Sequence, residues 1–281
     1  MPPVALVLLA VGSVQFGAAL AKTLFDEAGA GGTVFLRVLF AAAVLAIIWR
    51  PLARGRPARD LWLVAAFGLT LAGMNLAFYA SLDRIPLGVA VTFEFVGPLG
   101  VAVAASRRRL DLLWVVLAAV GILLLADFGD FGGLDETGVA LALLAGGFWA
   151  AYILLSARTG KAFPGGSGLA LAMIVASALL APVGVADAGS ALLEPPVLAL
   201  GLAVAILSSA IPYSLELEAL RRLPAGVFGV LMSLEPAVAA LAGYVVLGET
   251  LGVREVAAIG FVVVASAGAA KSASPEEPPD A

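Results

Sequence analysis

Residues 168–186 read GLALAMIVASALLAPVGVA, a run without a single charged side chain. A helix rises about 1.5 Å per residue, so about 20 such residues cross the hydrocarbon core of a bilayer. Lipid offers the backbone no hydrogen-bond partner, and a helix satisfies its own N–H and C=O groups. This stretch therefore predicts a transmembrane helix.

The rest of the chain has a similar composition. Its 281 residues are 62% hydrophobic and 13% charged, and the mean hydropathy is +1.07. Soluble domains are about 45–50% apolar and about 25% charged, so lipid must solvate much of this chain. Ten stretches qualify as transmembrane helices. They are 4–21, 33–49, 61–82, 86–105, 112–126, 137–156, 168–186, 197–218, 224–247 and 253–270.

Basic residues predict the orientation of these helices. With a cytoplasmic N-terminus, twelve of the 16 Lys and Arg residues fall in the tail and the loops of that side. Three fall on the opposite side, and Arg37 lies within a span. Cytoplasmic loops are enriched in positive charge, so we expect a multi-pass protein with both termini in the cytoplasm.

Two segments indicate an internal repeat. LDRIPLGV (82–89) aligns with LRRLPAGV (220–227), and in the same register Pro98 meets Pro236. Since each half would contain five helices, an odd number, the halves must have opposite topology. Inverted repeats are typical of secondary transporters, because two similar halves provide a route to alternating access.

The expected fold is thus an all-α membrane protein of ten transmembrane helices, arranged as two inverted five-helix repeats. The first repeat is expected at 1–126 and the second at 127–270. The remaining residues, 271–281, are polar and Pro-rich, which predicts a disordered cytoplasmic tail.

Two acidic residues, Glu94 and Glu235, fall near the middle of their spans. Charges there are costly and are functional candidates by default. Each precedes a proline, Pro98 or Pro236, that removes a helical hydrogen bond and kinks the helix. The carboxyl groups could bind a substrate amino group or carry a coupled proton. The alternative is a structural carboxyl group bonded to a neighbouring helix.

Other polar residues within spans extend this candidate site. Arg37 could hold a substrate carboxylate, although snorkelling or pairing with Glu249 is an equal alternative. Glu218 is expected to form a surface ion pair with Arg221 and Arg222, while Glu216 stays ambiguous. A further kink is expected at Pro212. Uncharged groups that could bind a desolvated amino acid are those of Gln15, Asn75, Tyr79, Trp149, Tyr152, Ser208 and Tyr213.

Four segments carry a resemblance to a known family. They are FEFVGPL (93–99), GGFWAAYIL (146–154), LSSAIPYSLELEALRRLP (207–224) and GVLMSLEPAVAALAGYVVLGETL (229–251). With them the chain resembles the EamA-type ten-helix branch of the drug/metabolite transporter superfamily, and within it the threonine/homoserine exporters. The resemblance implies a proton-coupled exporter of small amino acids or related metabolites in the bacterial inner membrane, with a central cavity between the halves.

Other classes of protein fit less well. The chain has no Cys and no His, and no span interior contains Lys, so a metal-dependent or Ser–Lys intramembrane enzyme is not expected. We expect no metal, no cofactor and no nucleic-acid partner. A receptor would not explain the repeat, and no ring-forming channel motif occurs. An exporter of drugs or other metabolites on the same fold stays open as the alternative.

Overall fold

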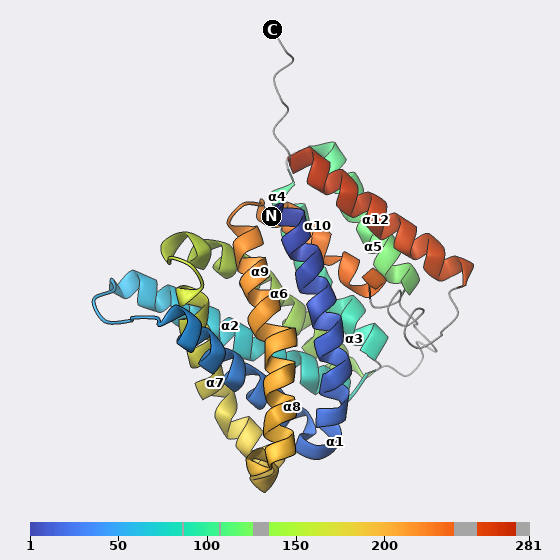
Figure 1. Cartoon of the computed structure of the whole chain (residues 1–281). Helices are drawn as coiled ribbons and strands as arrows, with labels where there is room; N and C mark the ends of the chain where they lie inside the picture. The colour runs from blue at the N-terminus through green and yellow to red at the C-terminus, as the bar shows by residue number, and fades with distance from the viewer. Residues whose placement is uncertain (86, 107, 126–134, 239–251, 274–281) are drawn as a thin grey trace.

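The computed structural model describes residues 1–85, 87–106, 108–125, 135–238 and 252–273, and within these ranges every regular element is a helix. The polypeptide forms a bundle of helices in which α1 and the helix pair α8 and α9 run side by side, while α5 and α12 pack together at one edge (Figure 1). Their bounds are α1 Pro3–Trp49, α2 Ala58–Leu82, α3 Leu87–Glu94, α4 Val96–Ala105, α5 Arg109–Leu125, α6 Glu136–Ala162, α7 Ser167–Ala188, η2 Gly189–Leu193, α8 Pro195–Ala205, η3 Ile206–Ala210, α9 Ile211–Leu220, α10 Ala225–Met232 and α12 Val253–Ala273.

Helix α1 contains two arms that reverse direction at Gly29 (Figure 1). Gly29 has φ 67° and ψ 174°, a backbone conformation that side chains disfavour. The second arm then begins on a carboxylate of α7, because the N–H of Gly31 donates to Oδ2 of Asp187 at 2.7 Å. This contact satisfies a free N–H at a helix start and fixes α1 against α7.

Two short helices, α3 and α10, have the same length and differ in position by 138 residues. Each ends four residues before a proline, at Glu94 before Pro98 and at Met232 before Pro236. A proline has no N–H to donate to the carbonyl four residues earlier, so the helix stops at the residue whose carbonyl is released. Both expected kinks therefore appear as breaks of the helix.

A third irregularity separates α8 from α9. Residues Ile206–Ala210 form a π-helical turn, and Pro212 follows within the first turn of α9. Such turns are rare and often lie at functional sites. This turn carries Ser208 and Ser209 into the interior, where both are buried.

Small residues allow the broken helices to pack closely. Gly97 of α4 and Gly146 of α6 meet so tightly that a Cβ on Gly97 would overlap the carbonyl of Gly146. Gly229 of α10 likewise meets the carbonyl of Pro98. Glycines at these positions bring α4, α6 and α10 together in the way that small residues do between membrane helices.

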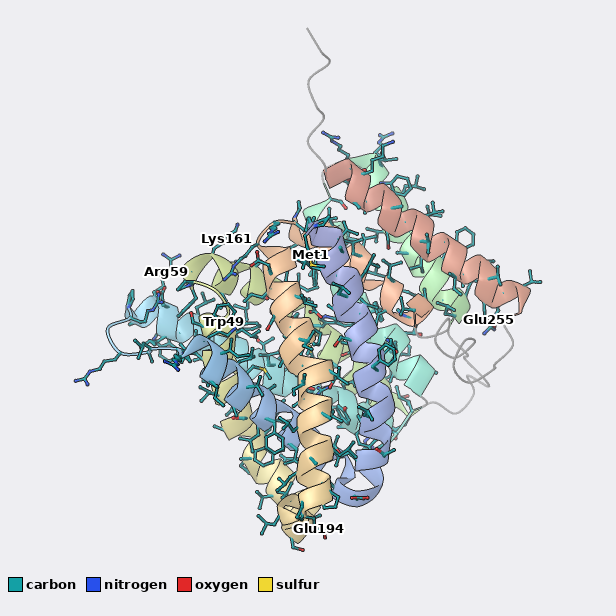
Figure 2. All side chains as sticks on the ribbon, in the orientation of Figure 1. Met1, Trp49, Arg59, Lys161, Glu194 and Glu255 are labelled. Atoms are coloured by element: carbon teal, nitrogen blue, oxygen red, sulfur yellow. The ribbon has the colours of Figure 1, made fainter. Side chains whose placement is uncertain are left out.

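Among the described residues, six helical stretches are long and apolar enough to cross a membrane. Large apolar side chains cover their outer surface, as lipid requires (Figure 2). The six are Glu27–Trp49, Ala58–Leu82, Glu136–Ala162, Ser167–Leu193, Pro195–Leu220 and Val253–Ser272, and three shorter apolar helices are Pro3–Gly17, Val89–Ala105 and Ala225–Val238.

The end of α12 differs slightly from the sequence-based expectation. This helix continues to Ala273, so the first three residues of the segment 271–281 are helical. The remainder of the expected tail, 274–281, lies outside the described residues.

Candidate functional site

A cavity of about 530 Å³ lies between α1, α2, α3, α6, α9 and the break after α10. This volume is in the range of small-molecule binding sites. Every polar residue expected to bind substrate or a proton lines it, together with Arg37 and Pro236. They are Gln15, Asn75, Tyr79, Glu94, Trp149, Tyr152, Ser208, Tyr213 and Glu235.

The cationic part of the cavity is Arg37 of α1. Its Nη2 donates to Oδ1 of Asn75, which is itself buried and donates from Nδ2 to the carbonyl of Leu71 at 2.7 Å. The two bonds hold the amide of Asn75 with its oxygen toward the guanidinium. Nε of Arg37 is buried and has no partner among the described residues. Glu249, one alternative partner that the sequence offered, lies outside the described residues.

The acidic part of the cavity includes Glu94 and Glu235, and both lie at breaks of helices. Glu94 is the last residue of α3, and Glu235 follows the end of α10. Gln15 of α1 donates to the backbone carbonyl of Glu235 in a long hydrogen bond of 3.5 Å. The charges of Arg37 and Glu235 both act on Glu94, so the three side chains form one electrostatic group.

A third carboxyl group, Glu216, lines the same cavity and was left ambiguous by the sequence. It is 3% exposed, and its Oε2 accepts a 2.7 Å hydrogen bond from the hydroxyl of Tyr152. Its neighbour Glu218 points to the surface instead. The spacing from Tyr213 to Glu216, three residues on one helix face, was the signal that could have placed Glu216 in the cavity.

Aromatic rings form much of the cavity wall. The ring of Trp149 lies 4.9 Å from that of Phe95, and the rings of Tyr152 and Tyr213 are 5.5 Å apart. Tyr79 packs edge-on against Phe25 at 5.6 Å. Ser208 lines the cavity, but its hydroxyl is used within the helix, where it donates to the carbonyl of Val204 at 2.7 Å.

The pole near the end of α9 is closed by ion pairs and hydrogen bonds. As expected, Glu218 pairs with both arginines: Nη1 of Arg221 lies 2.7 Å from Oε2, and Arg222 contacts Oε1. Arg221 also reaches across to the end of α6, where Nε donates to the carbonyl of Gly160 at 2.7 Å. Its Nη2 donates to the carbonyls of Phe163 and Gly165 in the turn before α7.

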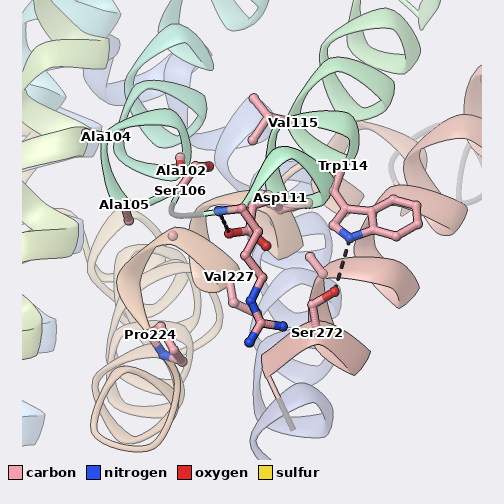
Figure 3. A pocket seen from close by; sticks show the side chains of 14 residues that line it. Ala102, Ala104, Ala105, Ser106, Asp111, Trp114, Val115, Pro224, Val227 and Ser272 are labelled. Atoms are coloured by element: carbon pink, nitrogen blue, oxygen red, sulfur yellow. Dashed lines mark hydrogen bonds between the residues drawn. The ribbon is translucent and has the colours of Figure 1, made fainter.

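A second cavity of about 530 Å³ lies between α4, α5, α10 and α12 (Figure 3). Its polar groups mostly bond to one another or to their own helices. Trp114 donates to the hydroxyl of Ser272 at 3.2 Å, and Ser106 donates to the carbonyl of Ala102 at 2.8 Å. This cavity therefore offers fewer groups to a polar ligand than the one that contains Arg37.

The apolar helices and the enclosed charges define a multi-pass membrane protein with a polar central cavity. Comparison with known proteins likewise indicates a membrane transporter. The model of the EamA-like transporter family matches residues 136–270. The threonine/homoserine exporter RhtA of Escherichia coli (strain K12) is 47% identical over 268 residues, which cover 95% of this chain and 90% of that protein. The same exporter of Salmonella typhimurium (strain SL1344) is 46% identical over equal coverage.

The chain belongs to the EamA-like transporter family. It is therefore a transporter and not an enzyme. A solved crystal structure also shares the fold, with a TM-score of 0.76 over 96% of this chain and 97% of that one at 20% sequence identity.

Proposed function

We propose that this chain exports threonine, homoserine and similar small amino acids across the bacterial inner membrane, coupled to protons. The observation that carries the proposal is the cavity in which Arg37 lies with three carboxyl groups. The similarity to the threonine/homoserine exporters supports this substrate class.

An amino acid without water needs partners for both of its charges. The guanidinium of Arg37 suits a carboxylate, because its planar donors match two oxygens. Glu94 and Glu235 suit the ammonium group. Pro236 leaves the carbonyl of Met232 without its helical donor, which adds an acceptor at the break beside Glu235.

The charge balance of the cavity favours coupling to protons. Among the described residues, one guanidinium and the carboxyl groups of Glu94, Glu216 and Glu235 line the cavity, so full ionisation of these groups would leave two uncompensated negative charges among apolar helices. Such charges are costly in a membrane. A zwitterionic substrate adds no net charge, so protons are the simplest compensation, and in this proposal Glu94 or Glu235 exchanges one.

We further propose ten transmembrane helices in two inverted five-helix repeats, 1–126 and 127–270. The equal lengths of α3 and α10, each ending four residues before a proline, support this arrangement. Met1, Arg59 and Lys161 lie toward the same pole, while Glu194 lies at the opposite one (Figure 2). Cytoplasmic loops are enriched in positive charge, which supports a cytoplasmic N-terminus.

In alternating access, the cavity would open at one pole of the bundle while the other pole is closed. The cavity extends to Phe25, Leu82 and Ile85, near the pole of the Gly29 turn. Arg221 ties α9 to α6 at the other pole. In this arrangement the site opens to the outside while the Arg221 contacts close the cytoplasmic side, and export requires these contacts to break.

The test is uptake of labelled threonine and homoserine into inside-out vesicles with an imposed pH gradient. We expect uptake to depend on the gradient and to fall at least about tenfold in Glu94→Gln and Glu235→Gln, since each loses a charged partner worth more than about 1.4 kcal/mol. Glu136→Gln, an exposed residue at the start of α6, is the control. Unchanged uptake in both cavity variants would refute the assignment, and no uptake of either amino acid would favour an exporter of drugs or other metabolites.

A further inference from the structure

We infer that Glu216, oriented by Tyr152, recognises the side-chain hydroxyl group of the substrate. The inference rests on the proposed function, because it names the group that would select hydroxylated amino acids within the same cavity. It makes Glu216 a specificity-determining residue, distinct from the carboxyl groups that would bind the ammonium group.

Glu216 is held in one orientation by its neighbours. Its Oε2 accepts the hydrogen bond from Tyr152, whose ring is 1% exposed and packs against Phe67 at 5.6 Å and Tyr213 at 5.5 Å. A ring packed on two sides has little freedom, so its hydroxyl fixes the carboxyl group as well. Among the described residues this is the one hydrogen bond of the Glu216 side chain, and a carboxyl group has room for more donors.

Glu216 comes from a different element than the other two carboxyl groups, because it lies on α9 and they lie at the breaks after α3 and α10. Tyr213, which lines the same cavity, is three residues earlier on α9. A helix rises about 1.5 Å per residue, so Glu216 lies about 5 Å further along α9 than Tyr213, toward Arg221. An amino acid with its carboxylate at Arg37 and its ammonium group at Glu94 and Glu235 would extend its side chain into this part of the cavity.

The chemistry of this part of the cavity distinguishes a hydroxyl group from a methyl group. A hydroxyl group donates to the carboxyl oxygen of Glu216 and replaces the water lost on binding. A methyl group of the same size cannot donate, so the buried acceptor stays unpaired. A site that hydrogen-bonds a substrate hydroxyl group strongly rejects an analogue that lacks this group. An apolar pocket discriminates much more weakly against an analogue with an added hydroxyl or methylene group.

Threonine and valine provide the sharpest comparison, since they have the same shape and differ by hydroxyl against methyl. We expect the wild-type protein to transport threonine at least about tenfold more efficiently than valine. The variant Glu216→Met keeps a long side chain but removes the acceptor. It should lower kcat/KM for threonine about 10- to 100-fold and leave kcat/KM for valine unchanged or raised.

Tyr152→Phe is the second variant, because it keeps the ring that packs against Phe67 and Tyr213. It should shift the ratio of threonine to valine transport in the same direction by a smaller factor. Ser177→Ala is the control, because this hydroxyl donates to the carbonyl of Ile174 within α7 and does not line the cavity. Rates are normalised to the amount of folded transporter by size-exclusion chromatography.

An equal loss of threonine and valine transport in both variants would overturn the inference, since it would indicate a role in binding the ammonium group, in proton transfer or in folding. A threonine to valine ratio that both variants leave unchanged would also overturn it. Failure of the proposed function looks different, because then the wild-type protein transports neither threonine nor homoserine.

Discussion

The carbonyl oxygen of Gly146 in α6 lies directly against Gly97 in α4, with no space for a side chain between them. On the other side of the contact, the carbonyl of Glu94 faces Gly146. This backbone contact holds the segment that carries Glu94 against α6, next to the break at the end of α3. Close approach of this kind is what glycine permits in membrane helices.

Alanine at this contact should destabilise the protein. We expect Gly97→Ala or Gly146→Ala to cost about 1–3 kcal/mol, because the added methyl group forces α4 and α6 apart. The measurement is the midpoint of thermal unfolding in detergent. Gly100→Ala and Gly147→Ala are matched controls, since an added Cβ at either position meets no atom within 4 Å. Equal midpoints in all four variants would show that the contact does not limit stability.

The bond between Asn75 and Arg37 should be required for substrate binding. Asn75→Leu removes the acceptor and leaves the guanidinium without its described partner, so Arg37 should lose its orientation. A hydrogen bond to a charged group is worth about 1.5–3 kcal/mol. We therefore expect KM for threonine to rise about tenfold or more. Ser81→Ala, on the same helix but outside the cavity, should leave KM unchanged.

Loss of the Arg221 contacts should open the pole at the end of α9, which the proposed topology places in the cytoplasm. In Arg221→Ala the carbonyls of Gly160, Phe163 and Gly165 lose their donor. The chain contains no cysteine, so a single Thr159→Cys reports on this buried region without background. We expect its reaction with a maleimide in inside-out vesicles to speed up about tenfold or more. Arg222→Ala is the control, and an equal increase there would argue against a specific role of Arg221.

Two more cysteine positions test the orientation. Ala53 and Ser190 are exposed and lie in the turns between α1 and α2 and after α7. If the N-terminus is cytoplasmic, a maleimide that cannot cross the membrane should label Ser190→Cys in intact cells. It should label Ala53→Cys only after permeabilisation. Labelling of both, or of Ala53→Cys alone, in intact cells would contradict the proposed topology.

Two kinds of feature followed from the sequence because they depend on neighbours along the chain. Apolar length predicts which stretches lipid can solvate, and the described part of the chain is helical in each of those stretches. Proline removes a donor from a known carbonyl, so Pro98 and Pro236 predicted the breaks that end α3 and α10. Both effects act within one helix and need no tertiary contact.

Glu216 and Glu218 show what a single helix cannot determine. They are two residues apart on α9, and both are acidic residues near a cluster of arginines. Their side chains point in different directions from α9 and therefore have different partners. Glu216 accepts a hydrogen bond from Tyr152 of α6 in the cavity. Glu218 forms ion pairs with Arg221 and Arg222 at the surface. The sequence by itself determined the membrane setting, the helical stretches and their breaks. Only the packing of distant helices decided which polar groups share the cavity, because burial and partners are properties of that packing.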